Sequence, residues 1–436
     1  MRVLYLTLLA GFSLPLLISA QAANPLATDI DRAAQETMPL VVAWRRDFHQ
    51  HPELGNSEVR TAKVIADQLR KLGYDVTTGV AKTGVVATLK GGRPGPVVAL
   101  RSDMDALPVT EQVDLPFKST QKAMWNGQQV GVMHACGHDN HMAILLGAAT
   151  IFAKLRNQLP GTVKLIFQPA EEGAPAGEVG GAEVMVKEHV LENPRVDAIF
   201  GLHVFPGPAG QISYRPGPIM ASADSFTIKI RGKQTHGAVP WGGVDPIVIG
   251  AQIVNALQTI VSRNVNIAEA PAVVTVATFH GGNRFNIVPD DAELGGTIRA
   301  FGEDARKDIR RRLETISKNI AEAAGGSAEI SYSLGYPVTI NDPRLTNRMV
   351  PTLTRVAGAD NVRVAPLTGT AEDFSFFGQK VPSLFVFLGV TPRDQDSTKA
   401  PQNHSPLFFA DESALPVGVR VMTNLAIDYL YQQSPR

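Results

Sequence analysis

The stretch Val97-Val98-Ala99-Leu100-Arg101-Ser102-Asp103-Met104-Asp105 decides the fold class. Its first four residues are continuously apolar, which is typical of a strand buried on both faces of a parallel sheet. Asp103 and Asp105 follow directly, and in parallel sheets functional sites form outside the carboxyl ends of the strands. The two aspartates are candidate metal ligands, supports for a metal-bound histidine, or turn formers, and the pattern alone leaves these roles open.

Strands and helices alternate on both sides of this stretch. This alternation indicates an α/β domain with a largely parallel sheet. Helices are predicted over residues 30–48, 59–72, 142–155 and 412–431, and strands over 74–78, 84–90, 97–102, 163–168, 198–202 and 383–389.

The order of elements changes near Ala221. Strands predicted at 224–231, 272–280, 291–301 and 328–334 and helices at 244–263 and 303–324 give the order β-α-β-β-α-β, which is the ferredoxin-like pattern. The simplest arrangement is a mainly parallel-sheet α/β domain, built from residues 23–221 and 337–436. An inserted ferredoxin-like α+β lid domain, residues 222–336, interrupts it.

The composition of the 436 residues is that of an ordinary globular protein, with 44% hydrophobic and 19% charged residues. Lys plus Arg and Asp plus Glu number 41 each, so the formal net charge is zero. Because no basic field exists to hold a polyanion, nucleic acid is excluded as a partner.

Residues 1–22 are predicted to be a signal peptide. Arg2 precedes an apolar run over residues 3–18, and Ala20-Gln21-Ala22 fits the rule for cleavage after Ala22. The alternative is a single membrane anchor, but the run is short and no charged stop follows it. We expect an exported protein, periplasmic or extracellular, with no stable membrane span after cleavage, because no later run reaches about 18 apolar residues.

The single cysteine, Cys136, cannot form an internal disulfide, so it is a free thiol, an intermolecular partner or a ligand. His138 follows two residues later, a spacing that cannot place both side chains on one helix face. In a loop, Gly137 would let the two donors converge on one ion, and thiolate and imidazole suit zinc and its neighbours. The alternative is a buried cysteine beside an N-capping Asp139.

Two acidic residues, Glu171 and Glu172, follow the predicted strand at 163–168. In extended chain they would point in opposite directions, so that one could hold a metal while the other reached a water molecule. The alternative is a solvated acidic pair. His203 follows the strand at 198–202 and His404 lies in a loop, and either could be a ligand or a structural histidine.

Together, these motifs and their order resemble the amidohydrolase branch of the aminoacylase and zinc-carboxypeptidase superfamily, which includes hippurate hydrolases and indole-acetyl-amino-acid hydrolases. The resemblance covers nearly the whole predicted mature chain. It rests on residues 44–54, 101–108, 133–141, 168–173, 201–206, 235–240, 286–289, 296–299, 371–374 and 404–408.

The resemblance implies a catalytic domain that holds two divalent metal ions per subunit, Zn or Mn. Glu171 matches the general base, and Asp105 matches an aspartate that supports the ligands without binding metal. Asp103 stands where many relatives have a ligating histidine and is not counted as a ligand; His134 and His141 are expected to orient the ligand loop. The implied ligands are Cys136, in the place of the bridging residue, and His138, Glu172, His203 and His404.

In the predicted lid, His236 matches a histidine that reaches an active site, often the partner subunit's, and helps to polarise the scissile carbonyl. Asn286 and Arg299 resemble residues that hold the substrate carboxylate. The alternatives are a turn role for His236 and a surface role for Arg299. The implied reaction is hydrolysis of the amide bond of a small N-acyl amino acid or dipeptide-like substrate, by a homodimer formed through the lid.

Three other readings compete with this one. A cysteine hydrolase would use Cys136 as nucleophile and His138 as base, but their spacing is poor for such a pair and Glu171 would be idle. A binding protein could keep the lid and lack turnover. A neighbouring activity, such as a dipeptidase or desuccinylase, fits the same motifs, because the sequence fixes neither the acyl group nor the amino acid.

Overall fold

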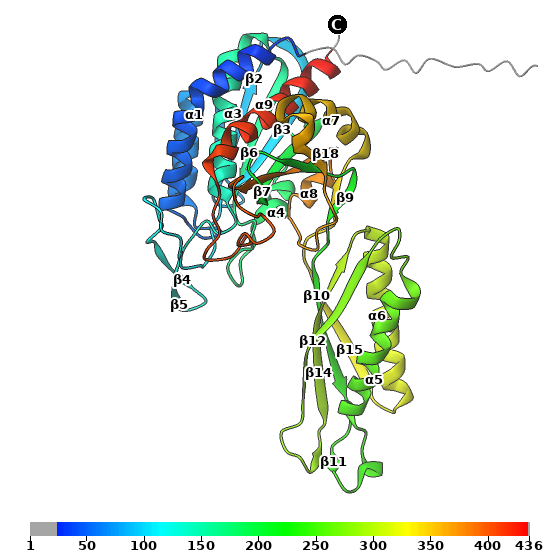
Figure 1. Ribbon diagram of the computed structural model, residues 1–436. Helices are drawn as coiled ribbons and strands as arrows, with labels where there is room; N and C mark the ends of the chain where they lie inside the picture. The colour runs from blue at the N-terminus through cyan, green and yellow to red at the C-terminus, as the bar shows by residue number, and fades with distance from the viewer. Residues whose placement is uncertain (1–23, 435–436) are drawn as a thin grey trace, which may run out of the picture.

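The larger unit of the computed structural model is built on an eight-stranded sheet (Figure 1). The structure describes residues 24–434, so the predicted signal peptide lies outside the described residues. The central strands β6, β3, β7 and β18 run parallel, as predicted, and the remaining strands add antiparallel pairs at both sides. The strand order is β1 (Asp75–Val80), β2 (Gly84–Lys90), β6 (Pro160–Gln168), β3 (Arg93–Asp103), β7 (Ala198–Pro208), β18 (Ser383–Thr391), β8 (Ile212–Tyr214) and β17 (Val362–Val364).

Helices cover both faces of this sheet, because its central strands are apolar on both sides. Val98 and Leu100 of β3 pack into one core, and Ala99 between them packs into the other. The first core contains residues of α1 (Ala27–Gln50), α2 (Val59–Lys71), α3 (His138–Leu155), α7 (Pro343–Ala357) and α9 (Leu415–Gln433). The second contains residues of α4 (Gly181–Lys187) and α8 (Ser375–Gly378). Among residues 24–434, no helix is long and apolar enough to cross a membrane.

The second unit is a four-stranded antiparallel sheet with two helices on one face (Figure 1). Side chains of β10 alternate: Phe226, Ile228 and Ile230 are buried against the helices, while Ser225 and Lys229 are exposed on the other face. The strand order is β12 (Ala272–Gly281), β14 (Asp291–Ala300), β10 (Asp224–Arg231) and β15 (Ser327–Leu334), and the helices are α5 (Pro246–Thr259) and α6 (Glu303–Ala323). Along the chain these elements follow the order β-α-β-β-α-β.

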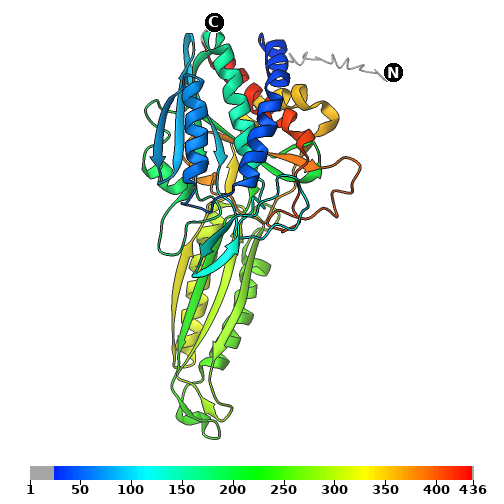
Figure 2. The ribbon, with the colours of Figure 1, turned by 90° about the vertical axis from the view of Figure 1, so that its left-hand side faces the viewer.

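A small two-stranded antiparallel ribbon of β11 (Thr235–His236) and β13 (Ile287–Val288) lies at the end of this second domain that is farthest from the eight-stranded sheet (Figures 1 and 2). Two aromatic side chains beside it face solvent: Trp241 is 81% exposed and Phe285 is 98% exposed. Two short antiparallel pairings in the larger domain lie outside the eight-stranded sheet: β4 (Lys122–Trp125) with β5 (Gln128–Gly131), and β9 (Gly217–Met220) with β16 (Thr339–Asn341). Within that sheet, the edge strand β17 pairs in parallel with β8.

Candidate metal centre

A cluster of metal-ligating side chains lies at the carboxyl ends of the central strands. Asp103 is the last residue of β3, and Glu171 and Glu172 lie in a turn just after β6. This is the edge at which parallel sheets form their sites. A cavity of about 220 Å³ opens there, lined by Cys136, Glu171, Glu172, His203, Phe205, Met220, Tyr336, Thr370, Ala371, Glu372, Gln402, Asn403 and His404.

Two buried histidines present their Nε2 atoms to the cluster. The Nδ1 atom of His138 donates to the main-chain oxygen of Asp105 at 2.8 Å, and that of His203 donates to the main-chain oxygen of Val204 at 2.8 Å. Bonds of this kind fix the ring orientation and leave Nε2 as the metal-binding nitrogen. The Nε2 atom of His203 lies 3.4 Å from Cys136 Sγ, and that of His138 lies 3.9 Å from a Glu171 oxygen.

The other predicted ligands join the same cluster. Donor atoms of Cys136, Glu172 and His404 all lie within 4.8 Å of one another, and Glu172 Oε1 is 2.9 Å from His404 Nε2. A second group with the same spacing contains His138, Glu171 and Glu172. The structure therefore brings together all five predicted ligands and the predicted base.

The donor set fits divalent metal ions. A thiol, three imidazoles and carboxylates converge on one cavity, and this mixture of sulfur, nitrogen and oxygen suits zinc and neighbouring transition metals. The Nε2 atom of His138 is buried, yet finds no hydrogen-bond partner among residues 24–434. Buried polar atoms are normally paired, so this nitrogen has the environment of a ligand atom.

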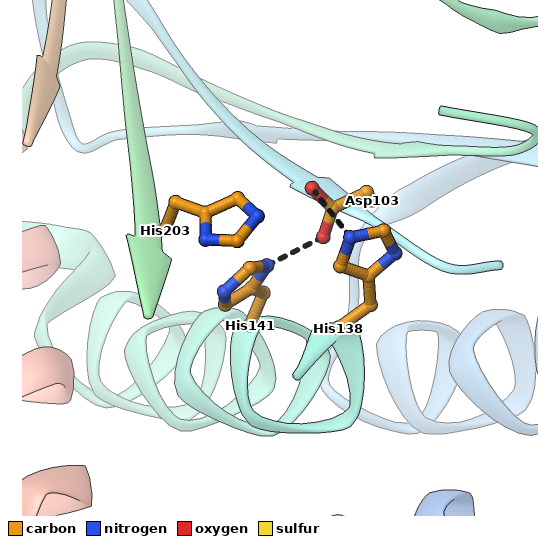
Figure 3. Close-up of side chains that lie close together, drawn as sticks. All are labelled: Asp103, His138, His141 and His203. Atoms are coloured by element: carbon orange, nitrogen blue, oxygen red, sulfur yellow. Dashed lines mark hydrogen bonds and ion pairs between the residues drawn. The ribbon is translucent and has the colours of Figure 1, made fainter. Parts of the chain in front are cut away.

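Asp103 and His141 lie beside the two candidate ligands His138 and His203 (Figure 3). His141 Nδ1 bonds to Asp103 Oδ1 at 2.6 Å, and its Nε2 accepts a hydrogen bond from the backbone N–H of Val204 at 2.8 Å. Since both ring nitrogens are used, His141 has no nitrogen left for a metal and instead ties α3 to β3 and β7. The second oxygen of Asp103 accepts from Arg101 at 2.8 Å.

Asp105 holds a candidate ligand on each side. Its main-chain oxygen accepts from His138, and its Oδ2 accepts from the backbone N–H of Glu172 at 2.9 Å. His134 has no comparable bond: both of its ring nitrogens are buried without a partner in the part of the chain that the structure describes, and burial lowers its pKa to about 3. The expected role of His134 in orienting the ligand loop therefore stays a prediction.

Glu171 is a buried carboxylate among other carboxylates. Burial raises its pKa well above the usual value, and the nearby charges of Glu372, Glu172 and Asp373 add to the rise. A raised pKa suits a group that must take up and release a proton near neutral pH.

Three residues that sequence reasoning did not assign lie near Glu171. Arg101 is 1% exposed and lies 2.8 Å from Asp103 and 2.9 Å from both Glu372 and Asp373. It is thus the counter-ion of three buried carboxylates. Glu372 and Asp373 lie in the motif Ala371-Glu372-Asp373-Phe374, which carried the resemblance but was given no chemical role.

Three local predictions about backbone were wrong. Glu171 and Glu172 lie in a turn rather than in extended chain, because Ala170 has φ of 50° and its N–H is held by Glu58 Oε1 at 2.8 Å. Both carboxylates consequently approach His138. His138 begins helix α3 rather than lying in a loop, after Gly137 with φ of 92°. His203 lies inside β7 and does not follow it, because the strand continues to Pro208.

The predicted catalytic histidine of the lid, His236, and the predicted substrate-binding residues Asn286 and Arg299 do not line this cavity within one chain. His236 and Asn286 lie at the remote ribbon of β11 and β13, where the N–H of Gly237 donates to the main-chain oxygen of Asn286 at 2.8 Å (Figures 1 and 2). Arg299 lies on β14, paired with Val273 of β12, and is half-buried.

This fold and site define a metal-dependent hydrolase. The sequence model of peptidase family M20/M25/M40 matches residues 99–428, and the chain belongs to this family. It is a hydrolase of the metallopeptidase and amidohydrolase type, as the motifs predicted.

Similar proteins include enzymes with several named activities. Thermostable carboxypeptidase 2 of Saccharolobus solfataricus is 41% identical over 89% of this chain and 95% of its own length. N-acetylcysteine deacetylase of Bacillus subtilis is 38% identical over 89% of this chain and 96% of its own. A solved dinuclear metal-binding peptidase of the M20 family from Bacillus subtilis superposes with a TM-score of 0.76 at 35% identity, covering 91% of this chain and 99% of that one.

Proposed function

We propose that this protein hydrolyses the amide bond of N-acyl amino acids at a dinuclear metal site, with Glu171 as the general base. The observation that carries the proposal is the position of Glu171: a buried carboxylate of raised pKa, beside the ligand cluster and lining its cavity. The deacetylase among the relatives supports an N-acyl amino acid as substrate.

Each residue of the cluster has a role in this proposal. When bound by Cys136, His138, Glu172, His203 and His404, two divalent ions, Zn or Mn, would supply Lewis acid that activates water and polarises the carbonyl. Glu171 takes the proton of the attacking water on a carboxylate oxygen and delivers it to the leaving nitrogen. Asp105 keeps His138 and Glu172 in position.

The second domain would act as a lid and as the surface of a homodimer. β12 is an edge strand, and it exposes Val273 (54% exposed) and Phe279 (39% exposed); α5 beside it exposes Val248 (53% exposed). Unpaired edges and exposed apolar groups favour association. In such a dimer the remote ribbon of β11 and β13 would bring His236 to the partner's cavity, and Asn286 and Arg299 would bind the substrate carboxylate.

Export to the periplasm or the extracellular space is proposed on the sequence of residues 1–22 alone. Sequencing the N-terminus of the secreted protein should find Ala23 as the first residue. An intact leader on the mature protein would contradict it.

The reaction is tested with metal-free protein, to which zinc or manganese is added back, on benzoyl, acetyl and indole-acetyl amino acids and on dipeptides. We expect metal-dependent release of free amino acid. Glu171→Gln should keep its metal and lose nearly all turnover, while Glu183→Gln, a matched change at an exposed position on α4, should change nothing. Faster cleavage of the dipeptides would favour a carboxypeptidase, which the archaeal relative also suggests. No turnover with either metal would refute the proposal.

A further inference from the structure

We propose that Tyr336 is a positioning residue that couples the second domain to the general base. Its hydroxyl donates to the main-chain oxygen of Glu171 at 2.5 Å, and its ring lines the cavity. Tyr336 follows β15 by two residues, on the segment that returns from the second domain to the first. This inference rests on the proposed role of Glu171.

The backbone of Tyr336 is fastened to the second domain. Its main-chain oxygen accepts from the N–H of Ala223, the residue before β10, at 2.9 Å. On either side of it, the N–H of Gly335 donates to Asp224 Oδ1 at 3.2 Å, and the N–H of Val338 donates to Glu303 Oε1 at 2.8 Å. The two segments that connect the domains, one before β10 and one after β15, are thus hydrogen-bonded to each other.

A buried ion pair anchors these contacts to helix α6. Asp224 is 3% exposed and binds Arg306 through both carboxylate oxygens, at 2.5 and 2.8 Å, and Arg310 at 3.0 Å. Arg306 also donates to the main-chain oxygen of Gly335 at 3.2 Å. Any rotation of the second domain about this junction therefore moves Tyr336 with it.

The other end of the tyrosine reaches the turn that carries Glu171. On the side of the first domain, Glu58 holds the N–H of Ala170, and on the side of the junction Tyr336 holds the next carbonyl, that of Glu171. A shift of about 1 Å in a catalytic group can cost roughly a hundredfold in rate. The hydrogen bond from Tyr336 therefore ties the position of Glu171 to the orientation of the second domain, alongside the bonds from the N–H of Glu172 to Asp105 and from the N–H of Asp373 to Glu171 Oε1, which come from the first domain.

The test compares two substitutions that each remove one hydroxyl. Tyr336→Phe removes the bond to Glu171, and Tyr332→Phe removes an equivalent bond to the main-chain oxygen of Arg310, inside the second domain. We expect Tyr336→Phe to lower kcat by about 2- to 12-fold, the range set by one neutral hydrogen bond, with KM and metal content unchanged. Amide hydrogen exchange over residues 169–173 should become faster. Tyr332→Phe should alter neither quantity.

A third variant tests the coupling itself. Glu303→Ala removes the contacts with the N–H of Val338 and with Arg306, and so loosens the junction without touching the cavity. It should speed exchange over residues 169–173 in the otherwise unchanged protein and have no further effect when combined with Tyr336→Phe. Exchange that is unchanged in Tyr336→Phe, or additive effects of the two changes, would overturn the inference. Because exchange needs no substrate, this outcome is separate from a failure of the proposed reaction.

Discussion

Replacing Arg101 by Met should destabilise the larger domain strongly. Arg101 is 1% exposed, and its guanidinium lies within 2.9 Å of carboxylate oxygens of Asp103, Glu372 and Asp373, each of them buried. Removal of one partner from a buried ion pair costs about 3–5 kcal/mol, because the remaining charges stay buried without compensation. Since three carboxylates lose the same partner, we expect a loss in the upper half of that range.

The assay is urea unfolding followed by tryptophan fluorescence; two of the three tryptophans, Trp44 on α1 and Trp125 on β4, lie in the larger domain. Arg231→Met is the matched control, because Arg231 pairs with Asp291 at 3.0 Å on the surface, where the two side chains are 63% and 62% exposed. Exposed pairs contribute about 0–1 kcal/mol. An Arg101→Met protein within 1 kcal/mol of the unchanged protein, with chelator present, would refute the idea that Arg101 is the principal counter-ion of this site.

Three further outcomes are expected. Asp224→Asn should lower the stability of the protein at neutral pH and make its stability fall less steeply in acid. Burial alone would raise the pKa of Asp224, but Arg306 and Arg310 outweigh it and lower this pKa. The stabilisation by Asp224 is therefore complete above about pH 4 and disappears as the pH falls through the depressed pKa, which urea midpoints from pH 7 to 3 would check. If the partner subunit supplies His236, mixing the inactive Glu171→Gln and His236→Ala proteins should restore activity in mixed dimers. A mixture that stays inactive after subunit exchange would contradict a site completed by the partner. Zinc affinity should rise with pH, because Cys136 and His138 must both lose a proton when they bind the metal. Burial raises the pKa of Cys136, and nearby carboxylates outweigh burial and raise the pKa of His138 to about 10. Calorimetry in two buffers would measure the protons released.

The candidate metal ligands and Glu171 were predictable because most of them lie in short motifs next to buried strands. Apolar runs predict the central strands, and their carboxyl ends point to Asp103, Glu171 and His203. The order of elements in the second domain was also predictable, since β10 shows the alternation of a half-buried strand.

The contacts between distant segments could not be predicted in this way. Arg101 looks like an ordinary residue of a strand until the fold places Asp373 beside it, 272 positions along the chain. The turn at Glu171 depends on Glu58, which comes from the start of α2. Helix α7 has a capping Asp342, yet Pro351 inside it interrupts the helical pattern and hides the element.

The charges of the cluster explain why a protein would keep so costly an arrangement. Arg101 serves Asp103, Glu372 and Asp373, which leaves Glu171 and Glu172 with no guanidinium of their own among the ion pairs of residues 24–434. Without metal, His138 is protonated, since its pKa is raised to about 10, and its positive charge neutralises part of this negative charge. Divalent ions would replace that proton and supply more charge than one imidazolium can. The same excess of carboxylates that makes the metal-free site unfavourable thus favours the binding of highly charged cations, and burial together with these carboxylates raises the pKa of Glu171 well above its usual value.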